Sequence, residues 1–192
     1  MRVLTTGFGP FLEHAVNPSD ALARALDGRK ALGVALRACS PLPVEHGRAA
    51  ALAIEAARRH RVDAIVAFGL AAGTPRIRVE HRGRNRGTSP HPDAAGRRVA
   101  GAVIPGAPAS RAATLPPDRV REALAAAGIA TDTSDDAGGY VCNDLYYRLL
   151  HAGWRTLFVH LPPDVAVDRV AGPMALGIAR AVLASAGRHG HR

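Results

Sequence analysis

Ala64-Ile65-Val66-Ala67-Phe68 is a short apolar run with nothing polar on either of the two faces that a strand would have. Such a run is typical of a strand that helices cover on both sides. The flanking segments agree, because residues 45–60 and 117–127 have helical patterns and Gly128 ends the second one. Strands and helices alternate, so we predict an α/β fold: a single-domain, three-layer α/β/α structure with a mostly parallel, twisted central sheet.

The same alternation extends to both ends of the chain. Helices are predicted at residues 19–26, with Ser19 as the N-cap, from about Cys142 onward, and at 165–184. Further strands are predicted at residues 2–6, 32–38, 76–80, 129–133 and 154–160. A chain of 192 residues without a linker suits one domain, so we assign residues 1–192 to it and expect the polar tail 187–192 to be frayed.

One stretch breaks this pattern. Residues 82–111 are rich in Gly, Pro, Arg and Ser and have little periodicity, so we predict a long loop. Loops of this length in compact domains are usually functional. Because this one follows Glu80 closely, we expect it to act as a lid or to contribute to substrate binding.

The composition excludes several classes of protein. No apolar run reaches the roughly 18 residues that cross a bilayer, and the N-terminus lacks the features of a secretion signal. With only Cys39 and Cys142, a disulfide framework is not expected. Free thiols suit a reducing compartment, so we predict a cytoplasmic protein with no membrane partner. The sequence allows a homo-oligomer but does not establish an oligomeric state.

The net charge of +9 comes almost entirely from arginine, since Lys30 is the only lysine among 25 basic residues. The densest cluster consists of Arg76, Arg78, Arg82, Arg84 and Arg86. Such a cluster can bind a polyanion. Aromatic residues make up only 4% of the chain, however, and no nucleic-acid module is recognisable. We therefore expect a solvated basic surface rather than specific nucleic-acid binding.

A cysteine stands at the start of a predicted helix, in Ala137-Gly138-Gly139-Tyr140-Val141-Cys142-Asn143. The helix dipole and free backbone N–H groups favour an anion there, so we expect the pKa of Cys142 to lie below the usual value of about 8.5. His160 and Glu80 each end a strand-like run, which makes them candidates for a base and for the acid that orients it. Because ligands collect at the carboxyl ends of strands in α/β sheets, we expect the three residues to converge there as a catalytic triad.

Simpler roles exist for residues of these types. An unpaired cysteine often only fills space in a core, and Cys39 is expected to be structural in this way. His46, His60 and His151 lie singly on predicted helix surfaces or ends, without zinc-ligand spacing. We expect them to be solvated or packing residues, and we expect no metal site and no cofactor.

Several motifs together resemble the pyroglutamyl peptidase I family of cysteine peptidases, in order along nearly the whole chain. They are Thr6-Gly7-Phe8-Gly9-Pro10-Phe11, Val16-Asn17-Pro18-Ser19, Leu42-Pro43-Val44, Gly69 with Gly73, Glu80 with Asn85, Pro92-Asp93 with Gly96, Thr114-Leu115-Pro116, Val141-Cys142-Asn143 and His160-Leu161-Pro162. The resemblance implies a cysteine peptidase that removes an N-terminal pyroglutamyl residue from peptides through a thioester intermediate. It implies Glu80, Cys142 and His160 as the catalytic residues.

The resemblance also implies a substrate pocket. Phe8 and Phe11 match phenylalanines that hold the flat lactam ring, Asn17 matches an asparagine that fixes the pocket, and Val141 joins them beside the cysteine. Without the family, Phe8 and Phe11 would more simply be core anchors that flank a turn. A phosphate-binding loop is a weaker interpretation, because the third glycine of the dinucleotide fingerprint is missing.

The chain departs from the family where the substrate is concerned. The family usually has Gly-Gln-Ala-Gly-Gly where this chain has Gly69-Leu70-Ala71-Ala72-Gly73, and we expect Ala71 at the place of the glutamine that contacts the lactam. Losing such a hydrogen bond costs roughly 1–3 kcal/mol. Two alternatives stay open: a thiol amidase or peptidase that keeps the triad but acts on another acyl group, and a non-catalytic basic domain that binds acidic partners through its arginine-rich loop.

Overall fold

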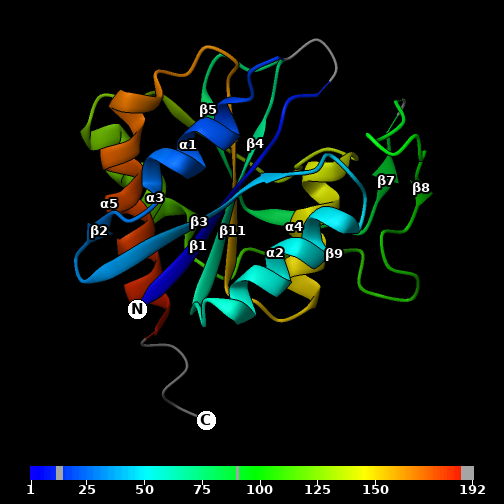
Figure 1. Cartoon of the computed structure of the whole chain (residues 1–192), viewed down its shortest axis with the longest axis horizontal. Coiled ribbons are helices and arrows are strands. Elements are labelled where there is room, and N and C mark those ends of the chain that lie inside the picture. Colours follow the sequence, from blue (N-terminus) through cyan, green and yellow to red (C-terminus); the bar gives the residue numbers. More distant parts are fainter. Residues whose placement is uncertain (12–14, 90, 187–192) are drawn as a thin grey trace.

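A seven-stranded sheet runs through the middle of the molecule (Figure 1). The structure is a computed structural model that describes residues 1–11, 15–89 and 91–186. In the order in which they pair across the sheet, the strands are β10 (Thr131–Ser134), β5 (Ile77–Glu80), β11 (Thr156–Leu161), β4 (Ala64–Leu70), β1 (Arg2–Phe8), β3 (Val34–Leu42) and β2 (Lys30–Ala31).

Most neighbouring strands are parallel, as predicted. β1 pairs in parallel with β3 and with β4, and β4 pairs in parallel with β11. β5 is the exception that matters for the site, because it runs antiparallel to β11 while β10 runs parallel to β5. The apolar run 64–68 forms most of β4, which is the central strand and is buried on both faces.

Helices cover both faces of the sheet, which confirms the predicted three layers (Figure 1). One face carries α1 (Pro18–Leu26), α3 (Pro117–Ala126) and α5 (Val167–Ala186), and the other carries α2 (Arg48–Arg59) and α4 (Val141–His151). Alternate strand residues divide between two apolar cores accordingly. Val66 and Phe68 pack in the core under the first group of helices, whereas Ile65 and Ala67 pack in the core under the second group.

The N-cap of α1 is Asn17, so the prediction of Ser19 was wrong. The Asn17 side chain accepts a hydrogen bond from the backbone N–H of Ser19, and Pro18 takes the first helical position, where its missing N–H costs nothing. The Ser19 hydroxyl instead accepts a bond from the backbone N–H of Phe8. This contact ties α1 to the end of β1.

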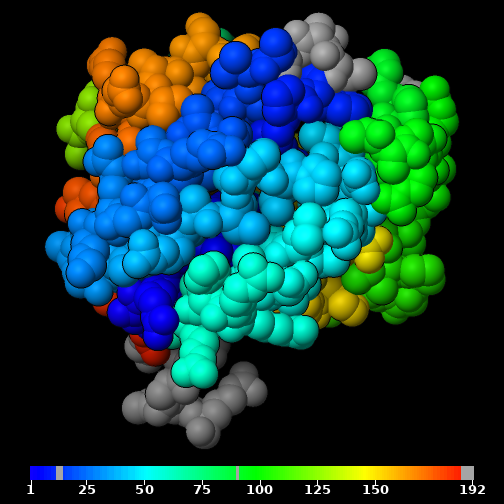
Figure 2. All heavy atoms as spheres, viewed as in Figure 1, coloured from blue at the N-terminus to red at the C-terminus, as the bar shows by residue number. Residues whose placement is uncertain are grey.

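The stretch 82–111 is more ordered than the plain loop that we predicted. Two small antiparallel sheets form within it and at its end: β6 (Arg82–Arg84) pairs with β9 (Ser110–Ala112), and β7 (Gly87–Thr88) pairs with β8 (Ala100–Gly101). Strands of two or three residues give no periodic signal, which is why the sequence did not predict them. We call residues 82–112 the arm. The arm lies beside α4 and forms one side of the molecule, drawn in green (Figure 2).

The predicted frayed tail, residues 187–192, lies outside the described residues. Within the part of the chain that the structure describes, no helix is both long and apolar enough to span a bilayer.

The packing of α5 against α3 depends on a glycine. A Cβ atom on Gly177 would lie 2.8 Å from the Cα atom of Val120 and 3.3 Å from the carbonyl oxygen of Arg119, and backbone atoms cannot move aside cheaply. Gly177→Ala should therefore lower the free energy of unfolding by about 1–3 kcal/mol, whereas Gly→Ala inside a helix usually raises it by about 0.5–1 kcal/mol. Urea unfolding measures this change. Leu183→Ala, on the exposed side of α5, is the control and should have little effect. A Gly177→Ala protein that is more stable would contradict the close approach.

Candidate active site

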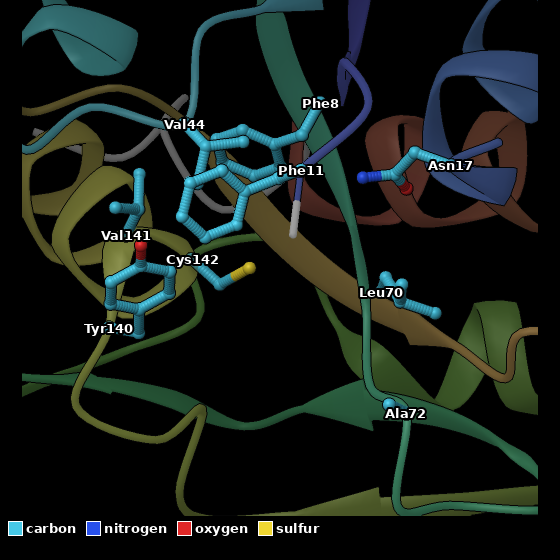
Figure 3. Close-up of a pocket in the computed structure, with 9 residues that line it drawn as sticks. All are labelled: Phe8, Phe11, Asn17, Val44, Leu70, Ala72, Tyr140, Val141 and Cys142. Atoms are coloured by element: carbon cyan, nitrogen blue, oxygen red, sulfur yellow. The ribbon is translucent and has the colours of Figure 1, made fainter. Parts of the chain in front are cut away.

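Cys142 is the second residue of α4. Two glycines lead into this helix: Gly138 has a φ of 85°, and a Cβ atom on Gly139 would collide with Thr88 of the arm. The N-cap residue is Tyr140, whose side chain makes no capping hydrogen bond. The Cys142 side chain points from the first turn of α4 into a cavity (Figure 3).

The sulfur atom lies against a glycine of the sheet. A Cβ atom on Gly69 of β4 would lie 2.7 Å from Cys142 Sγ and 2.8 Å from Phe158 Cζ, so a larger residue would displace the sulfur or the ring. Gly69 is also the register partner of His160 on β11. Register partners share one face of a sheet, so the thiol and the imidazole lie on the same face over adjacent strands.

His160 is joined to a buried carboxylate. Its Nδ1 atom lies 2.7 Å from Glu80 Oε1, and both side chains are buried. With the carboxylate as acceptor, Nδ1 carries the ring proton and Nε2 is the nitrogen that can take another. The imidazole also packs on Phe158, with ring centroids 4.8 Å apart. The histidine is thus fixed in position and in tautomer.

Glu80 and His160 meet for a different reason from the one we expected. Glu80 ends β5, but β5 runs antiparallel to β11, so its carboxyl end does not lie at the edge where the parallel strands end. In the register of these strands, Glu80 lies opposite Phe158 and Arg78 lies opposite His160. The carboxylate therefore reaches His160 diagonally along one face of the two strands.

The rest of the Glu80 carboxylate has few partners. Arg78 Nε lies 3.5 Å from Oε1, and the Tyr146 hydroxyl donates to the backbone oxygen of Glu80 rather than to its side chain. Among the described atoms, Oε2 has no hydrogen-bond partner. Burying a carboxylate is costly unless it is paired, so the contact with His160 is the main one that offsets this cost.

The pKa of Cys142 moves in the direction opposite to our prediction. Burial, and after it the negative charge of Glu80, raise the pKa of this thiol to about 12. Apolar neighbours such as Phe158 replace the water that would stabilise a thiolate, and this outweighs the N-terminus of α4. At neutral pH the cysteine is a thiol, so it needs a base before it can act as a nucleophile.

A cavity of about 160 Å³ opens in front of the sulfur (Figure 3). It is lined by four of the residues that we assigned to the substrate, Phe8, Phe11, Asn17 and Val141. The other lining residues are Val44, Leu70, Ala72, Tyr140 and Cys142. Phe8 is only 2% exposed and belongs to the core under α2 and α4, so it is a core anchor as well as part of the cavity wall.

Ala71, the fifth residue assigned to the substrate, does not line the cavity, although both of its neighbours do. Its backbone N–H donates instead to the carbonyl oxygen of Leu161. Counted from Gly69, the glutamine of the family motif corresponds to Leu70, so our assignment was wrong by one position. An apolar side chain stands at this point of the wall.

Asn17 is held by bonds within its own loop. Its Oδ1 atom accepts from the backbone N–H and from the hydroxyl of Ser19, and its Nδ2 atom donates to the carbonyl oxygen of Gly9 at 3.0 Å. Counting the bonds of the described residues, one amide N–H of Asn17 is left for a ligand, and the amide nitrogen points toward the cavity (Figure 3).

Tyr140 is a wall residue that the sequence analysis missed. Its hydroxyl donates to the carbonyl oxygen of Pro92 at 2.8 Å, and its ring centroid lies 5.8 Å from that of Phe11. Burial, then the charge of Asp93, and then the charge that Cys142 gains when it ionises at high pH, raise the pKa of Tyr140 to about 12. The sequence signal that could have identified Tyr140 as a wall residue is its position two residues before Cys142.

Asn143, directly after the cysteine, holds the arm against α4. Its buried side chain accepts from the backbone N–H of Arg84 and donates to the carbonyl oxygens of Arg84 and Arg86, all at 2.8–2.9 Å. The sequence analysis included Asn143 only as part of a motif. The structure gives it a positioning role, because it joins the cysteine helix to the arm.

The arginine cluster is not a free basic surface. Each guanidinium group in it lies within 3.6 Å of a carboxylate, in the pairs Arg76–Asp132, Arg78–Glu80, Arg82–Asp135, Arg84–Asp136 and Arg86–Asp136. Exposed pairs add little stability, but the carboxylates offset the positive charge of the cluster. The alternative hypothesis, a non-catalytic domain that binds acidic partners through these arginines, therefore loses its main support.

Outside the triad, the histidines and the cysteine that the structure describes do not gather into a metal site. His46 is buried rather than at a helix surface, with Nδ1 3.6 Å from Asp144 Oδ1, while His60 and His151 are exposed. Cys39 is half-buried in β3 and unpaired. Among the residues that the structure describes, no group of three or more His, Cys, Asp or Glu side chains could hold a metal ion.

Comparison with known proteins agrees with this geometry. A family model described as pyroglutamyl peptidase matches residues 1–186. The pyrrolidone-carboxylate peptidase of Gloeobacter violaceus is 39% identical over 187 residues, which cover 93% of this chain and 90% of that protein. The Pyrococcus furiosus protein of the same name is 32% identical, over 88% of this chain and 86% of its own.

Solved structures show the same relationship. The crystal structure of pyroglutamyl peptidase I from Bacillus amyloliquefaciens superposes with a TM-score of 0.89 at 28% identity, over 96% of each chain. A mutant pyrrolidone carboxyl peptidase from Pyrococcus furiosus gives a TM-score of 0.86 at 27% identity, over 96% of this chain and 99% of that one. The similarity extends over the sheet, both helical layers and the segments that carry the cysteine, the histidine and the glutamate, and this chain belongs to the pyroglutamyl peptidase family.

Proposed function

We propose that this protein is a cysteine peptidase that removes an N-terminal pyroglutamyl residue from peptides. The observation that carries the proposal is the thiol of Cys142, which lies over Gly69 beside a buried Glu80–His160 pair and at the mouth of an apolar cavity. We assign Cys142 as the nucleophile, His160 as the base, Glu80 as the residue that orients the base, and the cavity as the pocket for a small acyl group.

The first half of the reaction forms a thioester. His160 Nε2 takes the proton from Cys142 Sγ, and the sulfur attacks the carbonyl carbon of the peptide bond that follows the pyroglutamyl residue. Backbone N–H groups in the first turn of α4 stabilise the negative oxygen of the tetrahedral intermediate. His160 then gives its proton to the leaving nitrogen, the C–N bond breaks, and the shortened peptide departs with a free amine.

The second half returns the enzyme to its starting state. His160 takes a proton from a water molecule, whose oxygen attacks the thioester carbonyl, and the C–S bond breaks to release pyroglutamate. The sulfur recovers its proton from His160. Glu80 keeps the imidazole in one tautomer throughout and stabilises the imidazolium that forms in both halves.

The cavity suits a pyroglutamyl ring. This ring is flat and uncharged and has no free amine, and the aromatic side chains of Phe8 and Phe11 provide apolar surface for it. We further propose that the enzyme works in the cytoplasm, because a thiol nucleophile needs a reducing compartment. An assembly of several copies is compatible with this site, since every residue of the proposed mechanism comes from one chain.

The triad assignment predicts the effects of two substitutions. Cys142→Ala should abolish release of the fluorophore from a pyroglutamyl aminomethylcoumarin amide. Glu80→Gln keeps the size of the side chain but loses its charge, and it should lower kcat by roughly 10⁴-fold, the scale found when the acid of a serine protease triad is replaced by its amide. Glu55→Gln, at an exposed position on α2, is the matched control and should keep wild-type kcat. Full activity in Glu80→Gln would remove Glu80 from the mechanism.

The raised pKa of Cys142 predicts how alkylation depends on pH. Only the thiolate reacts with iodoacetamide, and below the pKa the thiolate fraction grows tenfold for each pH unit. In a Cys39→Ser background, the alkylation rate of Cys142 should therefore rise about tenfold per unit between pH 7 and 9, as mass spectrometry can measure. A rate that stays constant over this range would show a preformed thiolate–imidazolium pair instead.

The close contact of Gly69 with the sulfur predicts a defect in catalysis. Gly69→Ala should push Cys142 Sγ out of line and lower kcat/KM by about 100-fold, since a shift of about 1 Å in a reacting group has an effect of this size. Gly73→Ala, in the turn that follows β4 and with open space around it, is the control and should retain activity. Equal activities of the two variants would show that Gly69 does not position the sulfur.

A further inference from the structure

The acyl cavity has apolar walls and a small volume. Its space of about 160 Å³ is well below the roughly 300–1,000 Å³ of pockets for drug-sized ligands, so it fits a single small ring. Phe8, Phe11, Val44 and Leu70 are among the apolar side chains that line that space (Figure 3). The shape of the ring, rather than its polar atoms, is what these residues can recognise.

The polar side chains of the wall have little left to offer a lactam. Asn17 Oδ1 accepts two bonds from Ser19, and its Nδ2 donates one N–H to Gly9. Within the described residues this leaves one amide N–H of Asn17, which can serve the ring carbonyl but not the ring N–H. The Tyr140 hydroxyl donates its hydrogen bond to the carbonyl oxygen of Pro92, so it has no O–H left for the ring carbonyl, and only its oxygen can still accept. Leu70 stands where a polar side chain could have accepted the lactam N–H.

The charge of the acyl group is a second property by which the cavity can select its substrates. No Asp, Glu, Lys, Arg or His is among the described lining residues, so an acyl group with a cationic amine would lose its hydration without gaining a partner. A prolyl residue has the same ring size as pyroglutamate but carries such a charge. The cavity should exclude it.

From these observations we infer that the cavity selects neutral five-membered rings by fit, and that it does not depend on a side-chain hydrogen bond to the lactam N–H. The substrate class then includes carbocyclic acyl groups as well as pyroglutamate, and Leu70 is the residue that sets this breadth. The inference rests on the proposed function of the site.

The loss of activity with an analogue that lacks the lactam N–H distinguishes a hydrogen-bonding pocket from an apolar one. A site built to hydrogen-bond a substrate N–H rejects the analogue that lacks it by about 10⁴–10⁵-fold, whereas an apolar pocket discriminates by only about 10–200-fold. The suitable analogue is the 3-oxocyclopentanecarbonyl group, in which a CH₂ group replaces the N–H of pyroglutamate and the ring carbonyl remains.

The experiment compares kcat/KM for three aminomethylcoumarin amides with the wild-type enzyme: pyroglutamyl, 3-oxocyclopentanecarbonyl and prolyl. We expect the carbocyclic amide to be cleaved with a loss of less than about 200-fold relative to pyroglutamyl, and the prolyl amide to be cleaved far more slowly than either. A loss larger than 200-fold for the carbocyclic amide, or cleavage of prolyl as fast as pyroglutamyl, would overturn the inference.

Three variants test the roles of Leu70 and Tyr140 in this selectivity. Leu70→Gln should raise the ratio of pyroglutamyl to carbocyclic cleavage at least tenfold, because the glutamine can accept the lactam N–H, whereas the apolar Leu70→Met should leave the ratio unchanged. Tyr140→Phe should also leave it unchanged. An unaltered ratio in Leu70→Gln, or a ratio that falls tenfold in Tyr140→Phe, would show that Leu70 does not set the breadth.

The outcomes also distinguish this inference from the proposed function. An enzyme that cleaves the pyroglutamyl amide but rejects the carbocyclic one would keep the proposed function and lose only the inference. A folded, reduced enzyme that cleaves none of the three amides would contradict the proposed function itself.

Discussion

The hydrogen bond between Glu80 and His160 is the interaction on which the site depends. A carboxylate with no exposure to water is costly, and His160 Nδ1 is its closest polar partner, at 2.7 Å. The same contact fixes the imidazole so that Nε2 is left to exchange protons. It exists because β5 runs antiparallel to β11 and brings Glu80 alongside the middle of that strand. The reversal of one strand in a mostly parallel sheet thus serves the chemistry directly.

The same carboxylate helps to keep the cysteine neutral. Burial and the charge of Glu80 both disfavour a thiolate in the free enzyme, so the positive end of α4 does not generate one. In the proposed reaction, the positive end of α4 acts at a later step. It stabilises the negative oxygen that forms near the first turn after proton transfer to His160 and attack on the substrate. Glu80 then stabilises the imidazolium. Charges form in pairs during the reaction, in surroundings that would penalise either of them alone.

Much of this arrangement could be predicted from the sequence, and the parts that could not have physical reasons. The apolar run 64–68 predicted a buried central strand, and the glycines before Cys142 predicted a helix start there, because both signals are local. The direction of β5 could not be predicted, since strand order and direction depend on contacts between distant segments. The pKa of Cys142 was predicted in the wrong direction, because burial is set by residues such as Phe158 that are not its neighbours in sequence.

The wall of the cavity explains why specificity can change while the catalytic residues stay. Phe8 and Val141 belong to the core under α2 and α4 and are almost fully buried, so changing them would create a cavity or a clash that destabilises the fold. Leu70, at the end of β4, is partly exposed and can be replaced at lower cost. In the proposed function, a substitution at Leu70 changes a side chain that faces the substrate ring. It leaves the preceding residue, Gly69, which the sulfur of Cys142 lies against, unchanged. In the proposed mechanism, selectivity and catalysis depend on the adjacent residues Leu70 and Gly69, and the packing around Leu70 is the less restrictive of the two.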